Sequence, residues 1–142
     1  MRVYQTKSGA LTGTDFHEVW RKASFIYKMI KKRSKRQPYL RSAYFCKDKI
    51  FLGLFWDHLF EKTWPDRLRR LRYFSAAIEL IENSRIEPSL KEDPQHSEDT
   101  LYRFSGFTKE KELFHVQVKF DQSTLKKYLI SIFPGKEEKA LR

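Results

Sequence analysis

Residues 100–134, TLYRFSGFTKEKELFHVQVKFDQSTLKKYLISIFP, contain three short runs in which apolar and polar side chains alternate. The runs cover 101–107, 113–120 and 127–133, and charged segments that are compatible with turns separate them. Alternation with a period of two over runs of this length is typical of half-buried β-strands. The pattern therefore predicts an antiparallel three-stranded meander over residues 100–134.

The alternation divides the predicted meander into two faces, because successive side chains of a strand point to opposite sides of the sheet. One face is apolar and is expected to cover the core; its members are Tyr102, Phe104, Phe114, Val116, Val118, Phe120, Tyr128, Ile130 and Ile132. The other face is mixed; its members are Arg103, Ser105, Phe107, His115, Gln117, Lys119, Leu129, Ser131 and Phe133. Because cations, an imidazole, an amide and hydroxyl groups meet there, we expect the mixed face to be the working surface. The large apolar groups among them indicate that another element or a partner covers part of it.

The chain has the length of one domain and a strongly basic composition. Its 142 residues suffice for one ordinary hydrophobic core, so we expect a single domain over 1–142. Hydrophobic residues make up 40% and aromatic residues 15%, which argues against a disordered chain. Lys and Arg exceed Asp and Glu by 29 to 18, a net charge of +11. A charge of this size favours a polyanionic partner, either nucleic acid or an acidic protein, and does not bear on the fold.

The patterns that the sequence lacks limit its chemistry. Cys46 is the only cysteine, so neither an intramolecular disulfide nor a cysteine-rich zinc site is expected. No apolar run approaches the roughly 20 residues that span a bilayer, and the N-terminus lacks a signal-peptide core, so we expect a cytoplasmic protein with no membrane partner. Phosphate-binding and metal-ligand motifs are absent, and carboxylates do not cluster in the predicted strands. We therefore expect no metal and no cofactor.

Two amphipathic helices are predicted before the meander. The first covers 14–36, begins near Asp15 with Glu18 as the second half of a capping box, and ends in a basic segment. That segment includes Lys31, Lys32 and Arg33. The second covers 65–84, starts with a proline in its first turn and is expected to be a core helix. Its apolar stripe consists of Leu68, Leu71, Phe74, Ala77, Ile78 and Ile81.

The clustered cations of both helices have two interpretations. The second helix begins with Arg67, Arg69, Arg70 and Arg72, although cations near a helix N-terminus oppose the helix dipole. Binding of phosphate or of an acidic partner would explain them, and so would salt bridges to neighbouring carboxylates. The basic end of the first helix is either a solvated end that complements the dipole or a phosphate-binding segment.

The remaining segments carry weaker signals. Residues 40–45 fit a short strand, and about 54–63 fit a short helix that carries His58 among aromatic residues. A lone histidine in such surroundings is more often structural than catalytic. Residues 83–99 form a long polar loop, and 135–142 form a charged tail that we expect to fray.

The order of helices followed by a compact antiparallel sheet resembles the barnase–EndoU–colicin–RelE group of small ribonucleases, in particular its phage-associated and mobile-element branch. The segments that carry the resemblance are RRLRYFSAAIELI, LYRFSGFT, FHVQVKF and LISIFP, which lie between residues 69 and 134. The resemblance implies an α+β fold with N-terminal helices packed on a C-terminal meander. It also implies metal-independent cleavage of RNA by attack of the ribose 2′-hydroxyl on the adjacent phosphate.

The resemblance also implies roles for residues of the mixed face. Arg103 and Lys119 would neutralise the charge of the phosphorane, and Ser131 would donate a hydrogen bond to a phosphate oxygen. His115 would transfer protons, with His58 as the alternate. Phe107 or Phe133 would stack on an unpaired base. The implied partners are RNA and an antitoxin or immunity protein.

Two other functions fit the same sequence. The chain could be a non-catalytic module that binds nucleic acid or an acidic partner through the cations of 67–72 and 28–36. It could also be a toxin or phage factor that acts on a protein target. A cation on an exposed sheet face is usually only solubilising, so the mixture of polar groups on the meander is what favours the ribonuclease.

Overall fold

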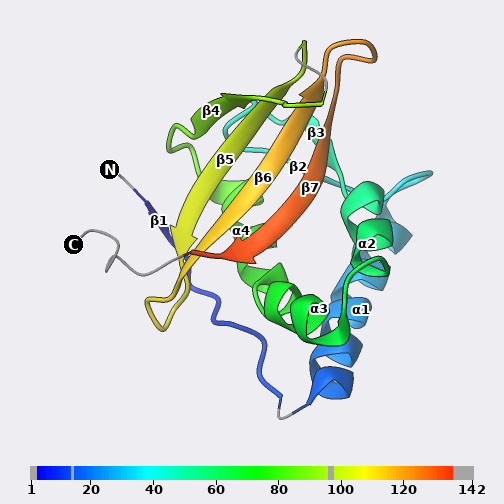
Figure 1. The fold of residues 1–142 in the computed structure, drawn as a ribbon, viewed down its shortest axis with the longest axis vertical. Helices are drawn as coiled ribbons and strands as arrows, with labels where there is room; N and C mark the ends of the chain where they lie inside the picture. Colours follow the sequence, from blue (N-terminus) through cyan, green and yellow to red (C-terminus); the bar gives the residue numbers. More distant parts are fainter. Residues whose placement is uncertain (1–2, 14, 96–97, 136–142) are drawn as a thin grey trace.

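The computed structural model describes residues 3–13, 15–95 and 98–135. Within these ranges the chain forms four helices and one curled sheet of seven strands, so the expected α+β class is confirmed (Figure 1). In chain order the elements are β1 (Tyr4–Gln5), α1 (Phe16–Arg33), β2 (Tyr39–Arg41), β3 (Lys49–Phe51), α2 (Gly53–Leu59), α3 (Trp64–Leu71), α4 (Phe74–Asn83), β4 (Ser89–Glu92), β5 (Thr100–Phe107), β6 (Leu113–Asp121) and β7 (Lys126–Pro134).

The three strands expected over 100–134 are β5, β6 and β7, and they form the centre of the sheet in antiparallel pairs. The strand order is β1-β5-β6-β7-β3-β2, with β4 also paired to β5. Strand β3 runs parallel to β7, and β2 runs antiparallel to β3. The short strands between the first two helices therefore widen the sheet beyond β7, on the side away from β5.

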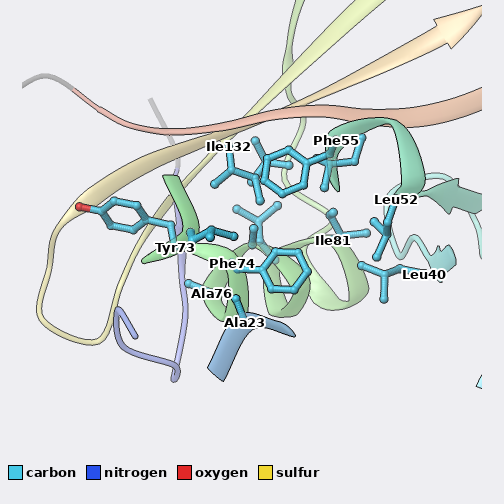
Figure 2. Close-up of a cluster of buried hydrophobic side chains, with 14 of the residues drawn as sticks. Ala23, Leu40, Leu52, Phe55, Tyr73, Phe74, Ala76, Ile81 and Ile132 are labelled. Atoms are coloured by element: carbon cyan, nitrogen blue, oxygen red, sulfur yellow. The ribbon is translucent and has the colours of Figure 1, made fainter. Parts of the chain in front are cut away.

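The helices cover one face of the sheet, and none of them lies on the opposite face of β5, β6 and β7, which we call the open face (Figure 1). In Figure 2, Ile132 of β7 lies above Phe74 of α4, with Phe55 of α2 beside them. Phe74, Phe114 and Ile132 are fully buried. Full burial of one such side chain stabilises a fold by about 1.5–3 kcal/mol, so this layer holds helices and sheet together.

No helix in the described ranges is long and apolar enough to cross a membrane.

Helix α1 begins where the capping pattern placed it. Asp15 is the N-cap residue, and its Oδ1 accepts a hydrogen bond of 3.1 Å from the backbone N–H of Glu18. Val19, Ala23 and Ile30 form its buried stripe. The helix ends at Arg33 rather than at residue 36, because the C-cap residue Ser34 adopts an extended backbone conformation (φ −96°, ψ 140°), and its hydroxyl also donates to the carbonyl of Ile30. Residue 14 lies outside the described residues.

The prediction of one helix over 65–84 is wrong, since the chain forms α3 and α4 with a break at Arg72 and Tyr73. The carbonyl of Arg72 accepts a 2.7 Å hydrogen bond from the N–H of Leu11, which belongs to the segment before α1. The Tyr73 ring stacks on Phe114 of β6 at 5.7 Å between centroids. The two tertiary contacts replace the helical geometry at this point.

A β-bulge changes the face assignment of β7. Gln117 pairs with Ser131, but Val118 pairs with Leu129, so Ile130 is the extra residue of the bulge. One extra residue moves the remaining side chains of a strand to the opposite face. Leu129 is therefore buried in the core and Tyr128 lies opposite Lys119 on the open face, the reverse of the prediction.

The polar segment 83–99 also differs from the prediction, because it contains strand β4, paired with the start of β5. All four residues of β4 are exposed, so no buried pattern marked the strand in the sequence. Of the tail expected over 135–142, only Gly135 belongs to the described residues.

Candidate functional site on the open sheet face

Five side chains of β5, β6 and β7 form a connected group on the open face, which we call the His115 cluster. Its members are Arg103, Ser105, His115, Gln117 and Phe133. Ser105 lies opposite His115, and its Oγ is 2.8 Å from His115 Nδ1. Arg103 lies opposite Gln117 and donates to Gln117 Oε1 at 3.3 Å. The Phe133 ring joins the two pairs, because its centre is 5.2 Å from the imidazole centre and 5.2 Å from the guanidinium carbon of Arg103.

The surroundings of His115 favour its neutral form. Burial lowers the pKa of its imidazole below the ordinary value of 6.5, and the positive charge of Arg103 lowers the pKa further. When Nδ1 carries the proton and donates it to Ser105 Oγ, Nε2 is free to accept a proton. Gly135 flanks this nitrogen, since a Cβ at that position would lie 3.0 Å from Nε2. His115 therefore has the properties of a general base at neutral pH.

Lys119 borders the His115 cluster, two residues along β6 from Gln117, but has partners of its own. It is four residues from His115 on β6, which is about 13 Å along a strand. Its ammonium group is 3.4 Å from Asp99 Oδ2 and 3.5 Å from Asp93 Oδ2. The side chains are largely buried, with 19% of Lys119 and 6% of Asp99 exposed. Two carboxylates outweigh one ammonium group, so Lys119 adds no net positive charge to the face.

The Ser131 hydroxyl is bound by an arginine of α3. Arg70 Nη1 donates to Ser131 Oγ at 2.9 Å and to the carbonyl of Ile132 at 3.2 Å. Its Nε is paired with Asp66 Oδ1 at 3.2 Å. Arg70 therefore ties α3 to β7, and Ser131 contributes to this connection.

The other arginines at the start of α3 also bind the chain itself. Arg67 donates two hydrogen bonds of 3.0 Å to backbone carbonyls just after α2. Arg72 donates to the carbonyl of Leu11 at 3.4 Å. Arg69 forms a surface ion pair of 2.8 Å with Asp66. Of the two interpretations of this arginine cluster, salt bridges to a carboxylate account for Arg69 and Arg70, whereas Arg67 and Arg72 donate to backbone carbonyls.

The remaining candidates of the resemblance lie at different distances from the cluster. Phe107 is on the open face, two residues along β5 from Ser105, and borders the cluster. His58 is half-buried on α2. In the part of the chain that the structure describes, the His58 side chain forms no hydrogen bond or ion pair with the cluster.

An aromatic row that was not predicted crosses the same face of the sheet. It consists of Tyr39 on β2, Phe51 on β3 and Tyr128 on β7, which are register partners across the three strands. The ring centroids are 6.2 Å apart for the first pair and 6.0 Å for the second. Leu40 and Ile50 alternate with these residues and are buried in the core. The aromatic row therefore points to the open side.

A groove lined mostly by cations lies beside this row, and we call it the basic groove. Its lining consists of Arg33, Lys35, Arg36, Gln37, Tyr39, Lys49, Phe51 and Lys126, without a carboxylate. Of the cations predicted at the end of the first helix, Arg33, Lys35 and Arg36 line the groove. Lys31 lines a second groove on the outer side of α1, and Lys32 is exposed. Besides the basic run at the end of α1, the sequence signals are the alternations Tyr39-Leu40-Arg41 and Lys49-Ile50-Phe51, each only three residues long.

Comparisons with protein-family models, with curated proteins and with solved structures find no match. Among the described residues, no group of three or more His, Cys, Asp or Glu side chains is arranged to hold a metal ion. The geometry and electrostatics of the open face are therefore the basis for proposing a function.

Proposed function

We propose that the protein is a metal-independent endoribonuclease and that the His115 cluster is its active site. The observation that carries the proposal is the meeting of a neutral imidazole and a guanidinium on an open sheet face, both against one aromatic ring. An uncharged imidazole accepts a proton, a guanidinium stabilises a developing anion, and an aromatic ring stacks on an unpaired base. The first two actions promote RNA transesterification, and the third positions the substrate strand. The resemblance to barnase–EndoU–colicin–RelE ribonucleases supports the same reaction.

In the proposed reaction His115 removes the proton of a ribose 2′-hydroxyl, and the 2′-oxygen forms a bond to the adjacent phosphorus. The bond between phosphorus and the 5′-oxygen breaks, and this oxygen leaves with a proton from the imidazolium or from water. The products are a 2′,3′-cyclic phosphate and a 5′-hydroxyl. Arg103 stabilises the charge on the non-bridging oxygens, and its hydrogen bond to Gln117 orients the guanidinium.

The geometry assigns framework roles to two of the expected site residues. Lys119 neutralises Asp93 and Asp99, and Ser131 receives a hydrogen bond from Arg70. Replacing Lys119 with Ala would leave two largely buried carboxylates without their cation. Such a loss destabilises a fold strongly, so inactivity of that variant would not identify a catalytic group.

The test is incubation of a mixed-sequence RNA in EDTA with the wild type and with His115→Gln. We expect the wild type to produce 2′,3′-cyclic phosphate ends, and we expect the variant to be slower by about 10²–10⁴-fold, the usual contribution of a general base. His17→Gln is the matched control, because His17 is an exposed residue of α1. This variant should cleave RNA at the same rate as the wild type. Intact RNA with the wild type, or equal rates for wild type and His115→Gln, would overturn the proposal.

The basic groove favours a second candidate function, a module that binds nucleic acid without cleaving it. It would account for the unpaired cations of the groove and assign no chemistry to His115. The same assay separates the two functions. RNA that is recovered intact but is retained by the protein on a gel would favour the binding module.

A further inference from the structure

We propose that the basic groove is a binding site for a single-stranded polynucleotide, with bases on Tyr39 and Phe51 and backbone phosphates on the surrounding cations. The site deepens the proposed function, because it lies on the same open face as the His115 cluster. It does not depend on catalysis, and its test uses a strand that cannot be cleaved.

The first argument is the charge of the groove. Five cations line it: Arg33, Lys35, Arg36, Lys49 and Lys126. Arg33 is paired with Glu82 at 3.2 Å across the exposed surface. Among the described residues the other four form no ion pair. The dipole of α1 favours cations at its end, but it does not explain why Lys49 of β3 and Lys126 of β7 meet them, because clustered like charges repel one another; a polyanionic ligand would explain the arrangement.

The second argument is that aromatic rings lie between these cations. Lys49 Nζ is 4.7 Å from the centre of the Tyr39 ring, and Lys126 Nζ is 5.7 Å from the centre of the Phe51 ring. Tyr39 and Phe51 are half-buried, so their rings are held by the sheet while one side remains accessible. Alternating cations and aromatic rings are the arrangement by which proteins bind single strands, because phosphates meet the cations and unpaired bases stack on the rings.

The third argument concerns the shape of the ligand. Bases are available for stacking in a single strand and are enclosed in a duplex, whereas phosphates are available in both. An acidic peptide would satisfy the cations but would leave Tyr39 and Phe51 without an aromatic partner. The combination therefore favours a single strand over a duplex and over an acidic protein.

The experiment measures fluorescence anisotropy of a labelled oligodeoxythymidylate of about 12 nucleotides, a length within the range of single-strand sites. This strand has no 2′-hydroxyl and cannot undergo the proposed cleavage, so failure of the ribonuclease proposal leaves the binding result unaffected. Oligouridylate measured in parallel in EDTA distinguishes a preference for RNA from binding to any single strand.

Two sets of variants test the two components of the site. Replacing Tyr39 or Phe51 with Leu should weaken binding by about 5–150-fold for each stacked base. The control is Phe25→Leu, because Phe25 is an exposed aromatic residue of α1 outside the basic groove; this variant should bind like the wild type. Lys49→Gln and Lys126→Gln should each reduce the slope of log affinity against log salt by about 0.7. Lys109→Gln removes one exposed charge in the turn between β5 and β6 and should leave the slope unchanged.

Several results would overturn the site. Affinity that is independent of salt would contradict the proposed phosphate contacts. Equal affinity for duplex and single strand would contradict the proposed stacking of bases on the rings. Equal losses in Lys109→Gln and Lys49→Gln would show that only the net charge of the protein matters. Unchanged binding by folded Tyr39→Leu and Phe51→Leu variants, or equally tight binding of polyglutamate, would replace the polynucleotide site with a general polyanion surface.

Discussion

Replacing Glu79 of α4 tests how the N-terminal segment is fastened to the fold. Its carboxylate accepts hydrogen bonds from the N–H groups of Lys7 and Ser8 at 2.9 Å, from Ser8 Oγ at 2.8 Å and from the Tyr4 hydroxyl at 3.3 Å. A single ion therefore holds three residues at and after β1. In Glu79→Gln one acceptor oxygen becomes an NH₂ group that faces N–H donors, so at least two of these bonds are lost.

The magnitude follows from the number of bonds. A hydrogen bond to a charged group contributes about 1.5–3 kcal/mol when buried, and the lower end applies here because the site is partly open to water. Loss of two bonds therefore costs roughly 3 kcal/mol. For a domain of this size about 1 kcal/mol corresponds to 2–4 °C, so we expect the melting temperature at pH 7 to fall by roughly 6–12 °C. Glu82→Gln, which removes an exposed surface pair from the same helix, should cost less than about 1 kcal/mol.

The dependence on pH provides an independent check. Burial alone would raise the pKa of Glu79, but the hydrogen bonds from Lys7, Ser8 and Tyr4 outweigh burial and hold the pKa below the ordinary value of 4.5. A lowered folded-state pKa stabilises the fold above the unfolded-state value, and this contribution is lost as the pH falls through the folded-state pKa. The difference between the wild type and Glu79→Gln should thus be constant from pH 7 to 5.5 and narrow below about pH 4.5. A variant within about 1 kcal/mol of the wild type at pH 7, or a difference that does not narrow in acid, would refute the reasoning.

Two further substitutions test contacts between the helices and the sheet, both by urea denaturation followed through tryptophan fluorescence. Gly106→Ala should destabilise the fold by about 1–3 kcal/mol, because the added Cβ would lie 2.8 Å from Leu80 of α4 and 2.9 Å from the Phe114 ring. Equal or greater stability of this variant would show that α4 can move away from β5. Arg70→Met should lower the free energy of unfolding by about 1–3 kcal/mol through loss of its hydrogen bonds to β7. Arg69→Met, at the surface, should lower it by less than about 1 kcal/mol. Equal effects of the two substitutions would contradict the role of Arg70 in connecting α3 to β7.

The meander could be predicted from the sequence because its signal is local. Alternation over eight or nine residues fixes both the strands and most of their faces, so Arg103, His115 and Gln117 were assigned to one surface without a structure. The error in β7 arose from the bulge at Ile130, which alternation cannot reveal because Leu129 and Ile130 are both apolar and either could face the core. The break between α3 and α4 was missed for a related reason, since the apolar stripe continues through it and tertiary contacts, of Arg72 with Leu11 and of Tyr73 with Phe114, mark it.

The partners of the charged residues could not be predicted, because they come from distant parts of the chain. Lys119 is neutralised by Asp93 and Asp99 from the polar segment before β5, in which no periodicity identified β4 or its neighbours. Arg70 meets Ser131 across 61 positions of sequence. The sequence therefore does not distinguish a cation that is paired within the fold from one that is available to bind a ligand, either on a sheet face or at the start of a helix.

The division between paired and unpaired cations constrains how a strand of RNA would cross the open face. Lys119 with Asp93 and Asp99 carries a net negative charge, and Lys119 lies opposite Tyr128, between the basic groove and the His115 cluster. Phosphates avoid such a position, so a strand held in the groove would place a base or a ribose over it and would bring its next phosphate to Arg103. Arg103 is half-buried, and among the described residues it contacts the neutral amide of Gln117 and the ring of Phe133, which leave its positive charge uncompensated. The cation that stabilises the transition state would on this reasoning be Arg103, and the acidic partners of Lys119 would direct the scissile phosphate toward it.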